Sequence, residues 1–270
     1  MSQVILIKGG GDIGTAVAVR LHQAGRPVVV VETPGIPILR RGISFGAAID
    51  QGEIVIEGIR SRLAGTRAEA TALLEQGIVP LWTAGWEAAA GALSLRVLID
   101  ARMMKRDQNM ETMMRHAPLV IGLGPGFTAG KDTHLVIETN HGSNLGRIIR
   151  DGAAEPYTGI ASQIQGHGIE RYLYAPADGT FLTTKEIGAR VEANELLGKI
   201  GPEDLRARFA GIVRGILKSG TTVRKGQKLV DVDPRGEEII TRTFTERALR
   251  IAEAVLLAVE EWEQRQERLC

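Results

Sequence analysis

The feature that most constrains this chain is a short apolar run that leads directly into a cluster of glycines. Val4–Ile7 is followed by the spacing Gly-x-Gly-x-x-Gly, with glycines at positions 9, 11 and 14. An apolar run of this length predicts a strand that is buried on both faces of a sheet. A helical pattern begins inside the glycine cluster and ends at Gly25. The stretch therefore predicts a strand, a tight turn and a helix in succession.

The glycine turn has the properties of an anion-binding loop. Its first glycine permits the turn, its second lets a phosphate approach the backbone, and its third lets helix and strand pack closely. The N–H groups at the start of a helix favour a negative charge. A second apolar run, Val28–Val31, ends at Glu32, near the usual place of a carboxylate that binds ribose hydroxyls. The alternative is a turn that serves chain geometry alone. The predicted nucleotide-type site comprises Gly9, Gly10, Gly11, Asp12, Ile13, Gly14 and Glu32.

The composition excludes several classes of protein. At 270 residues the chain is long enough for one or two domains with a sizeable core. Its 33 Lys and Arg against 32 Asp and Glu give a net charge of +1, so no bulk charge attracts nucleic acid or a membrane. The single cysteine, Cys270, excludes an internal disulfide framework and a cysteine-based zinc site. Since no secretory leader and no membrane-spanning run is present, we expect a cytoplasmic protein.

Further apolar runs predict that residues 1–165 form a Rossmann-like parallel sheet domain that binds a nucleotide or cofactor. Val97–Asp100 and Leu119–Gly122 resemble buried parallel strands. In a doubly wound sheet, the residues after the C-terminal ends of the strands line the binding crevice. Asp100 and Lys105 are therefore candidate crevice residues, with an exposed salt bridge as the alternative. The same rule gathers along one edge Gly9–Gly14, Glu32, Asp100 and the loop after Gly122.

That second loop is also dense in glycine, and we predict that it binds an anion opposite the first. Its glycines let the backbone approach a ligand, and Lys131 can neutralise a negative charge. A plain turn-rich connection is the alternative. The predicted residues of this loop are Gly122, Gly124, Pro125, Gly126, Phe127 and Lys131. Asp132 and His134 would need Glu138 or His141 to complete a metal site, and we expect no metal there.

Two arginines follow the second predicted strand. Arg40 and Arg41 come after the loop that begins at Thr33. Because guanidinium groups bind phosphates well, they could meet a ligand phosphate. A solvated charge pair is the alternative reading.

From about Arg171 the sequence consists of short apolar runs broken by glycine. Two segments there have similar residues at equivalent positions, 32 residues apart. We interpret residues 166–240 as a small β barrel-sandwich domain that resembles biotinyl and lipoyl carriers. The connection 201–208 contains no lysine, so we expect the scaffold without its swinging arm. A last strand is predicted over 238–243, and the segment 241–270 is predicted to contain the end of that strand and a helix that packs on the rest.

Several motifs together resemble the selenium-dependent molybdenum hydroxylase accessory (YqeB-type) family. That family is related in its Rossmann part to the xanthine dehydrogenase accessory factors. The resemblance spans nearly the whole chain, and the block GLGPGFTAG is its most specific part. The motifs are Lys8–Ile13, Arg40–Phe45, Gly122–Gly130, Ile169–Arg171, Ala175–Gly179 and Asp231–Gly236.

The resemblance implies a maturation factor that binds or delivers a sulfur- or selenium-bearing molybdenum cofactor, a molybdopterin dinucleotide. Its implied partners are a molybdenum hydroxylase client and sulfur- or selenium-donor proteins, and self-association is left open. Because Cys270 is the only thiol, selenium would be handled on the bound cofactor or with a partner's thiol. A loss of selenium transfer in Cys270→Ser would contradict that hypothesis.

Two other functions compete with this reading. The first is an NAD-dependent oxidoreductase that uses the glycine turn and Glu32, which would disfavour the 2′-phosphate of NADP. No clear catalytic dyad supports it, so a cofactor-binding maturation factor is favoured over a redox enzyme. The second is a scaffold whose small β domain docks the client enzyme, and it is compatible with the maturation reading.

Overall fold

The computed structural model describes residues 3–104 and 111–268, which form two compact units. The first unit contains the chain up to Pro34, then Ser44–Thr158, and then the chain from Phe244. The second contains Gly35–Ile43 and Gly159–Thr243. These units divide the chain differently from the predicted segments 1–165, 166–240 and 241–270, because each unit is assembled from separate stretches of sequence.

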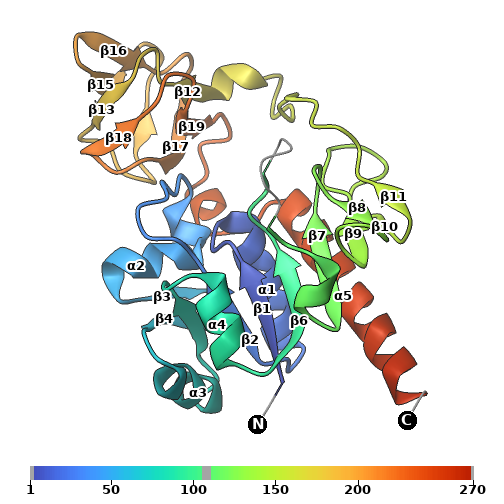
Figure 1. Ribbon diagram of the computed structural model, residues 1–270. Helices are drawn as coiled ribbons and strands as arrows, with labels where there is room; N and C mark the ends of the chain where they lie inside the picture. The colour runs from blue at the N-terminus through green and yellow to red at the C-terminus, as the bar shows by residue number, and fades with distance from the viewer. Residues whose placement is uncertain (1–2, 105–110, 269–270) are drawn as a thin grey trace. The chain divides into compact units, whose positions relative to one another are not determined.

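The first unit is built on a nine-stranded sheet with the order β10-β9-β7-β6-β1-β2-β5-β4-β3 (Figure 1). Every neighbouring pair from β9 through to β4 is parallel, whereas β10 and β3 are antiparallel to their neighbours. The strands are β1 (Val4–Lys8), β2 (Val28–Val31), β3 (Glu53–Ile56), β4 (Ile59–Ala64), β5 (Val79–Trp82), β6 (Leu95–Asp100), β7 (Leu119–Leu123), β9 (Leu135–Ile137) and β10 (Ile148–Ile149). A small ladder joins β8 (Thr128–Ala129) to β11 (Gly152–Ala153).

The sheet is mixed, so the predicted class of a Rossmann-like parallel sheet is wrong. Between Glu53 and Ala64 the chain forms two strands and turns straight back between them. Glu57 and Gly58 both adopt positive φ, at 49° and 80°. Two successive residues with positive φ produce the twist that a tight antiparallel hairpin requires, so β4 returns alongside β3.

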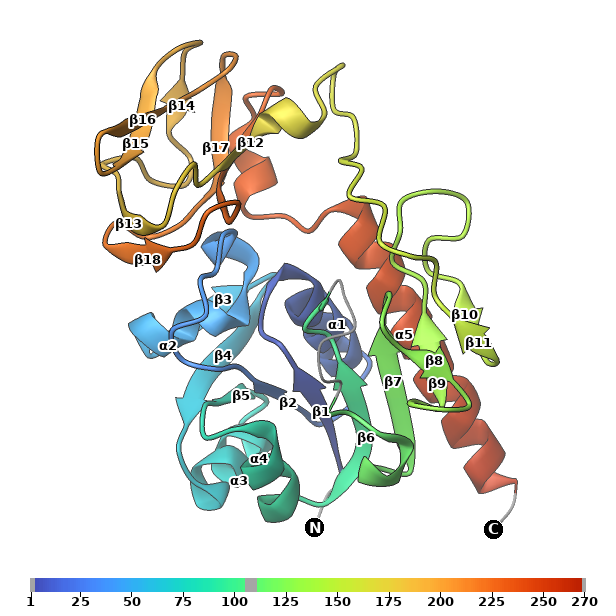
Figure 2. The same ribbon diagram turned by 45° about the horizontal axis from the view of Figure 1, so that its top comes forward.

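Helices cover both faces of this sheet (Figures 1 and 2). On one face lie α1 (Asp12–Gln23) and α5 (Glu246–Glu267), joined by an Arg20–Glu253 ion pair of 2.7 Å. On the other lie α3 (Arg67–Glu75) and α4 (Trp86–Ala92), over an apolar core that includes Val4, Leu6 and Leu98. The remaining helices of this unit are η2 (Phe45–Ala47), α2 (Ala48–Gln51) and η3 (Met114–His116).

The second unit contains two four-stranded antiparallel sheets, with orders β12-β19-β17-β14 and β16-β15-β13-β18. The strands are β12 (Tyr172–Tyr174), β13 (Gly179–Leu182), β14 (Arg190–Val191), β15 (Leu196–Ile200), β16 (Glu203–Arg206), β17 (Gly211–Ile216), β18 (Thr221–Val223) and β19 (Lys228–Asp233). Short helices η1 (Arg41–Ile43), η4 (Ile169–Arg171) and η5 (Glu238–Thr241) complete the unit.

The 32-residue repeat survives at the level of strands, but the predicted barrel-sandwich class does not stand. Gly179 of β13 corresponds to Gly211 of β17, and Leu197 of β15 corresponds to Leu229 of β19. Each such pair is split between the two sheets, because the first member lies in one sheet and the second in the other. The repeat therefore specifies two matched antiparallel sheets.

The predicted last strand over 238–243 is also wrong, because Glu238–Thr241 is the helix η5. Local hydrogen bonds explain the difference. The Thr241 hydroxyl donates to the Glu238 carbonyl at 2.7 Å, and the Arg242 N–H donates to the Ile239 carbonyl at 3.0 Å. Such local bonds satisfy the backbone without a partner strand.

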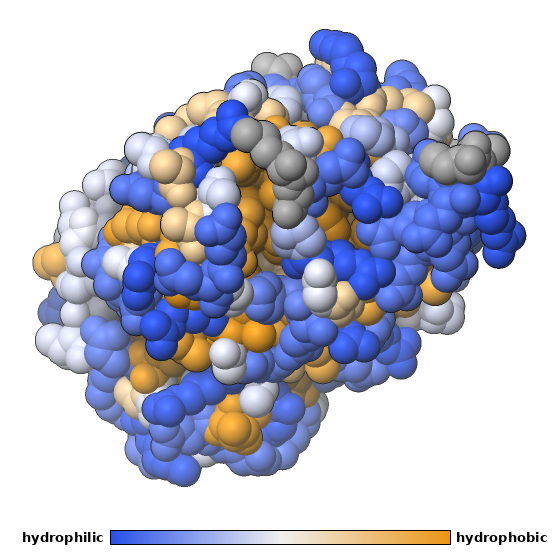
Figure 3. Space-filling view, turned by 90° about the horizontal axis from the view of Figure 1, so that it is seen from below, coloured by the Kyte–Doolittle hydropathy of each residue, from blue (hydrophilic) through white to orange (hydrophobic). Residues whose placement is uncertain are grey.

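The surface view in Figure 3 is mostly hydrophilic, with hydrophobic residues gathered in separate patches. Isolated apolar side chains on a surface are ordinary in folded proteins. Within residues 3–104 and 111–268, no helix combines the length and the apolar character that crossing a membrane requires.

Candidate functional site

The register of three parallel strands brings the ends of β1, β6 and β7 into line. Lys8 at the end of β1 is paired with Asp100 at the end of β6, and Asp100 is paired with Gly122 of β7. From β1 the chain proceeds to β2 on one side, and from β6 it proceeds to β7 on the other. Open α/β sheets bind ligands at such a reversal, outside the carboxyl ends of the strands. The edge above β1 and β6 is therefore the candidate site.

Lys8 lies at the centre of this edge, and it is only 2% exposed. Its Nζ donates to the Thr112 hydroxyl at 2.8 Å and lies 3.7 Å from Asp100 Oδ2. The same ammonium group is 4.2 Å from the centre of the Trp86 ring, at the start of α4. A cation over an indole face is attracted by the ring quadrupole. The lysine is thus held from three sides by a hydroxyl, a carboxylate and an aromatic ring.

Asp100 organises the cations around it. Arg102 donates to it through Nε at 3.0 Å and through Nη2 at 2.7 Å, which is a bidentate pair. The Thr112 hydroxyl donates to Asp100 Oδ2 at 2.7 Å. Met103, next to Arg102, has a φ of 55°, an uncommon conformation for a residue other than glycine. We call these residues the edge cluster: Lys8, Asp100, Arg102 and Thr112. Its two cations share the Asp100 carboxylate, and the Thr112 hydroxyl bonds to both Lys8 and Asp100.

The electrostatics of the edge cluster follow from its burial. Burial lowers the pKa of Lys8, and the charge of Asp100 only partly opposes that effect. Burial alone would raise the pKa of Asp100, but hydrogen bonds and charge from Arg102, with the charge of Lys8, outweigh it and lower that pKa. The carboxylate is therefore held ionised, and the charge on Lys8 depends on its neighbours.

The glycine turn between β1 and α1 is partly packed and partly open. A Cβ on Gly14 would come within 1.9 Å of the Gly9 carbonyl oxygen, so only glycine fits there. A Cβ on Gly10 would meet the Gly46 nitrogen at 2.9 Å. A Cβ on Gly11, by contrast, would have no atom within 4 Å among the described residues other than its two chain neighbours. Gly11 is the N-cap of α1 and has no side-chain capping bond, so the open part of the turn lies at the start of this helix. Asp12 accepts a bond from the N–H of Ile13 at 3.0 Å.

Glu32 does not face an open crevice. Its side chain is buried, with the residue 7% exposed, and both carboxylate oxygens accept backbone N–H groups. The N–H of Gly10 donates to Oε2 at 2.8 Å, and the N–H of Thr33 donates to Oε1 at 2.8 Å. Burial raises the pKa of Glu32, although these two bonds oppose the effect. The structure thus gives this carboxylate a structural partner, the glycine turn itself.

The second glycine loop leaves the same edge as the first, but its glycines make room for side chains. A Cβ on Gly122 would lie 2.4 Å from Phe127 Cγ, and Phe127 is buried. Gly124 has a φ of 80°, and its Cβ would lie 2.4 Å from the Thr139 hydroxyl. Pro125 and Gly126 lie between these contacts and are half-buried, and Lys131 is exposed. These contacts describe a packing role for the loop.

The polar residues beside this loop also bind backbone groups. Asp132 accepts the N–H of Thr128 at 3.0 Å, and His134 Nδ1 accepts the N–H of Val120 at 3.0 Å. Glu138 accepts three backbone N–H groups, one of them from Glu155 at 2.7 Å. In the part of the chain that the structure describes, no group of three His, Cys, Asp or Glu side chains could hold a metal ion.

Arg40 and Arg41 belong to the second unit and do not join the edge cluster. Arg40 donates to the carbonyls of Ile240 at 3.1 Å and Thr243 at 3.3 Å. Arg41 donates to the Ile216 carbonyl and forms an ion pair with Glu186 at 3.2 Å. Both arginines therefore bind their own unit. Lys105, the other predicted cation, lies outside the described residues.

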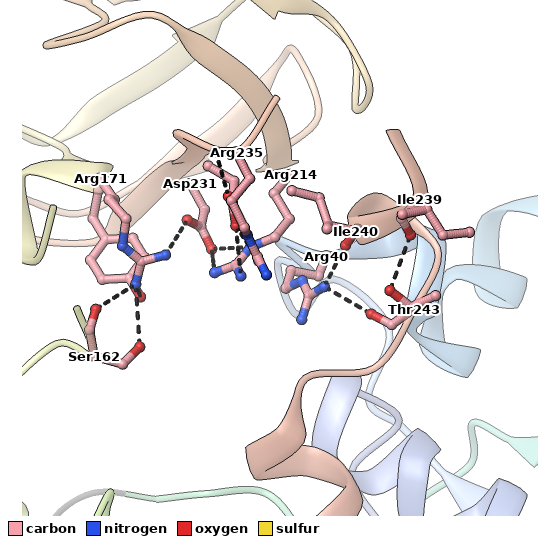
Figure 4. Close-up of polar contacts among 11 residues, drawn as sticks. Arg40, Ser162, Arg171, Arg214, Asp231, Arg235, Ile239, Ile240 and Thr243 are labelled. Atoms are coloured by element: carbon pink, nitrogen blue, oxygen red, sulfur yellow. Dashed lines mark hydrogen bonds and ion pairs between the residues drawn. The ribbon is translucent and has the colours of Figure 1, made fainter. Parts of the chain in front are cut away.

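The second unit holds its own line of buried charges, which Figure 4 shows. Asp231 is 2.6 Å from Arg214 and 3.7 Å from Arg171, which is fully buried. Arg214 also reaches Asp233 at 3.3 Å, and Arg235 pairs with the same carboxylate at 2.8 Å. We call these five residues the arginine–aspartate ladder, because cations and carboxylates alternate along it.

Sequence reasoning missed four members of the candidate site: Lys8, Arg102, Thr112 and Trp86. Arg102 could have been found, because it lies two residues beyond Asp100 at a strand end. Thr112 and Trp86 carry no local signal. They reach the site because η3 and α4 return the chain to the edge where β1 and β6 end.

The comparisons with known proteins bear on the family. No protein-family model matches the chain. The chain is 38% identical over 257 residues to the uncharacterized protein YqeB of Escherichia coli, a match that covers 95% of this chain and 47% of that protein. The match supports the YqeB-type family that the motifs indicated. This chain spans about half the length of that relative.

Solved structures resemble the chain only weakly. The ectoine utilization protein EutE (DoeB) of Ruegeria pomeroyi is 11% identical, with 86% of this chain and 85% of that chain covered and a TM-score of 0.27. An aspartoacylase family protein from Mesorhizobium loti is 12% identical, with 86% and 85% covered and a TM-score of 0.27. Cryptosporidium parvum malate dehydrogenase is 17% identical, with 48% and 40% covered and a TM-score of 0.27. Similarity at this level carries no argument about function.

Proposed function

We propose that this chain is an accessory protein in the maturation of a molybdenum hydroxylase, and that its first unit holds the phosphorylated molybdenum cofactor. The resemblance of its motifs supplies the pathway, and the match to YqeB supports the family without an activity. The client hydroxylase and a sulfur- or selenium-donor protein are the partners that this proposal requires. The cofactor is cargo in this scheme, so the protein needs to bind it and release it.

One observation carries the proposal: the edge cluster places two cations beside an open helix start. Lys8 and Arg102 both pair with Asp100, so the four residues of the edge cluster carry one more positive than negative charge when Lys8 is protonated; the charges of Glu87 and Glu111 also act on both cations. Gly11 leaves its Cβ position empty, which is where a phosphate would approach the backbone. The residues present therefore fit an anionic group on the ligand.

The oxidoreductase alternative has less support from the same geometry. It requires Glu32 to receive ribose hydroxyls, but that residue is only 7% exposed, and its two oxygens already accept backbone N–H groups. No reacting pair of side chains on the described residues of the edge calls for hydride chemistry either. Lys8, Arg102 and the open turn at Gly11 are suited to bind an anionic ligand.

A transfer experiment tests the proposal. The purified protein is loaded with molybdenum cofactor, mixed with a cofactor-free hydroxylase, and the molybdenum retained by each protein is measured. We expect Lys8→Met to lower cofactor retention at least tenfold, since it removes a buried cation from the site. Lys199→Met is the matched control, because Lys199 is exposed and lies in the second unit. Equal retention by wild type and Lys8→Met, or no retention by wild type, would contradict the proposal.

A further inference from the structure

The two sides of the glycine turn are not equally open to a ligand, and this difference limits which ligand the turn can bind. On the side of β2, the N–H of Gly10 is already bonded to Glu32 at 2.8 Å. On the side of β6, a Cβ on Gly9 would meet the backbone of Ala101 at 3.1 Å, which places the turn directly against the strand end that leads to Arg102. The turn is thus flanked by a satisfied carboxylate on one side and by the edge cluster on the other.

The segment around η2 covers the side that faces Glu32. The N–H of Gly46 donates to the Gly10 carbonyl at 2.9 Å, and the N–H of Phe45 donates to the Thr15 hydroxyl at 2.8 Å. Thr15 in turn donates to the Gly10 carbonyl at 3.2 Å. Phe45 is 0% exposed. Both backbone polar groups of Gly10 are therefore bonded within the protein, and chain fills the space beside them.

A dinucleotide would need this covered side. Its second nucleotide lies across the turn toward the end of β2, where its ribose hydroxyls donate to the acidic residue. Each oxygen of Glu32 already accepts one backbone N–H, and the residue is only 7% exposed, so ribose hydroxyls could reach it only if the surrounding chain moved. Gly46 would also have to leave Gly10. Nothing comparable obstructs Gly11, where a Cβ would meet no described atom within 4 Å other than those of its two chain neighbours.

We propose that the site takes a phosphomonoester, a ligand that ends in one phosphate group, in preference to a dinucleotide. This inference rests on the proposed function, and it narrows the form of the cofactor that the first unit binds. The terminal phosphate lies at Gly11 and is neutralised by Lys8 and Arg102. Glu32 acts as a positioning residue that keeps the turn closed toward β2.

Competing titrations by calorimetry test the inference on the full chain. The probes are molybdopterin in its monophosphate form, molybdopterin cytosine dinucleotide and NAD. We expect the monophosphate form to bind at least tenfold more tightly than either dinucleotide. If the pterin dinucleotide binds equally or better, the inference is wrong and the proposed function stands. If neither pterin binds, both are wrong.

Two variants test whether Glu32 positions the glycine turn or binds the ribose of a ligand. In Glu32→Gln, the ratio of affinities for the monophosphate and dinucleotide pterins should still favour the monophosphate at least tenfold. Glu138→Gln is the matched control, because Glu138 is also a buried carboxylate that accepts backbone N–H groups in the same unit. A dinucleotide affinity that falls selectively in Glu32→Gln, and not in Glu138→Gln, would show that Glu32 holds the ribose and would overturn the inference.

Discussion

The edge cluster and the arginine–aspartate ladder are both built largely from buried charges, and in each the cations outnumber the carboxylates by one, but the charges lie in different parts of their sheets. In the edge cluster, two cations share Asp100, and the Arg102 side chain is 25% exposed. In the ladder, carboxylates lie between arginines, and the side chains of Arg171 and Asp233 are 0% exposed, whereas that of Arg235 is 36% exposed. Charges that lie along neighbouring strands hold those strands together. Charges at the carboxyl end of a parallel sheet lie where such sheets bind ligands.

Burial of a charge is by itself a poor sign of function. A buried ion pair contributes little net stability over apolar packing, but the loss of one partner is costly. The ladder links η4, β17 and β19, so its charges fix the strands of the second unit. The edge cluster links the ends of β1 and β6 to a loop, where a ligand could replace part of the pairing.

The largest effect is expected for the ladder, in Asp231→Ala. This change leaves Arg171 and Arg214 buried without their shared carboxylate, and it should lower the free energy of unfolding of the second unit by about 3–5 kcal/mol. Urea unfolding measures it. The control Asp204→Ala removes an exposed carboxylate from the same unit and should change little. A ladder variant as stable as its control would mean that these charges do not hold the strands.

A smaller loss, with a gain in binding, is expected for Asp100→Asn. Stability should fall by about 2 kcal/mol, less than for Asp231→Ala, because the partly exposed Arg102 can recover water. Removal of the negative charge should increase the affinity for inorganic pyrophosphate several-fold, since Lys8 and Arg102 lose their internal anion. Urea unfolding and calorimetry measure the two effects. Weaker pyrophosphate binding in Asp100→Asn would contradict the ligand-binding role of the edge cluster.

Opposite pH dependences are expected for the two carboxylates of the first unit. The pKa of Asp100 is lowered from 3.8, so its contribution to stability is complete above pH 3.8 and is lost as the pH falls through the lowered pKa. The pKa of Glu32 is raised from 4.5, so its ionisation costs stability as the pH rises from 4.5 through the raised pKa. Urea unfolding of wild type, Asp100→Asn and Glu32→Gln between pH 3 and 8 measures both. If the difference in free energy of unfolding between wild type and each variant does not change with pH, these pKa directions are wrong.

Much of the first unit could be predicted from the sequence. The apolar runs gave β1, β2, β6 and β7, and the glycine spacing gave the turn before α1, because each is a local pattern. The hairpin at Glu57 and Gly58 was missed, since positive φ at a glutamate has no strong sequence signal. The segment 35–43 was assigned to the first half, because nothing local shows that Arg40 and Arg41 bind carbonyls more than 170 residues away.

The candidate site was predicted only in part, because its contacts join residues that are far apart in the sequence. Asp100 was placed at a strand end by pattern, but Lys8 was not predicted as a site residue, and the pairing of the two depends on the register between β1 and β6. Glu32 was assigned to a ligand from its position after β2, whereas its oxygens are used by Gly10 and Thr33. A residue type at the right spacing identifies an edge of the sheet. Which groups at that edge are still available is decided by contacts between distant segments.

The most direct test of the account is calorimetric titration of the molybdenum cofactor, in its monophosphate form, into wild type, Gly11→Val and Gly91→Val. A Cβ on either glycine would meet no other part of the described chain within 4 Å, apart from its chain neighbours and the nearby backbone of its own helix, so both variants should fold. If the ligand phosphate lies at Gly11, the valine there should lower affinity at least tenfold, and the valine at Gly91 on α4 should leave it unchanged. Full affinity in Gly11→Val would contradict the account.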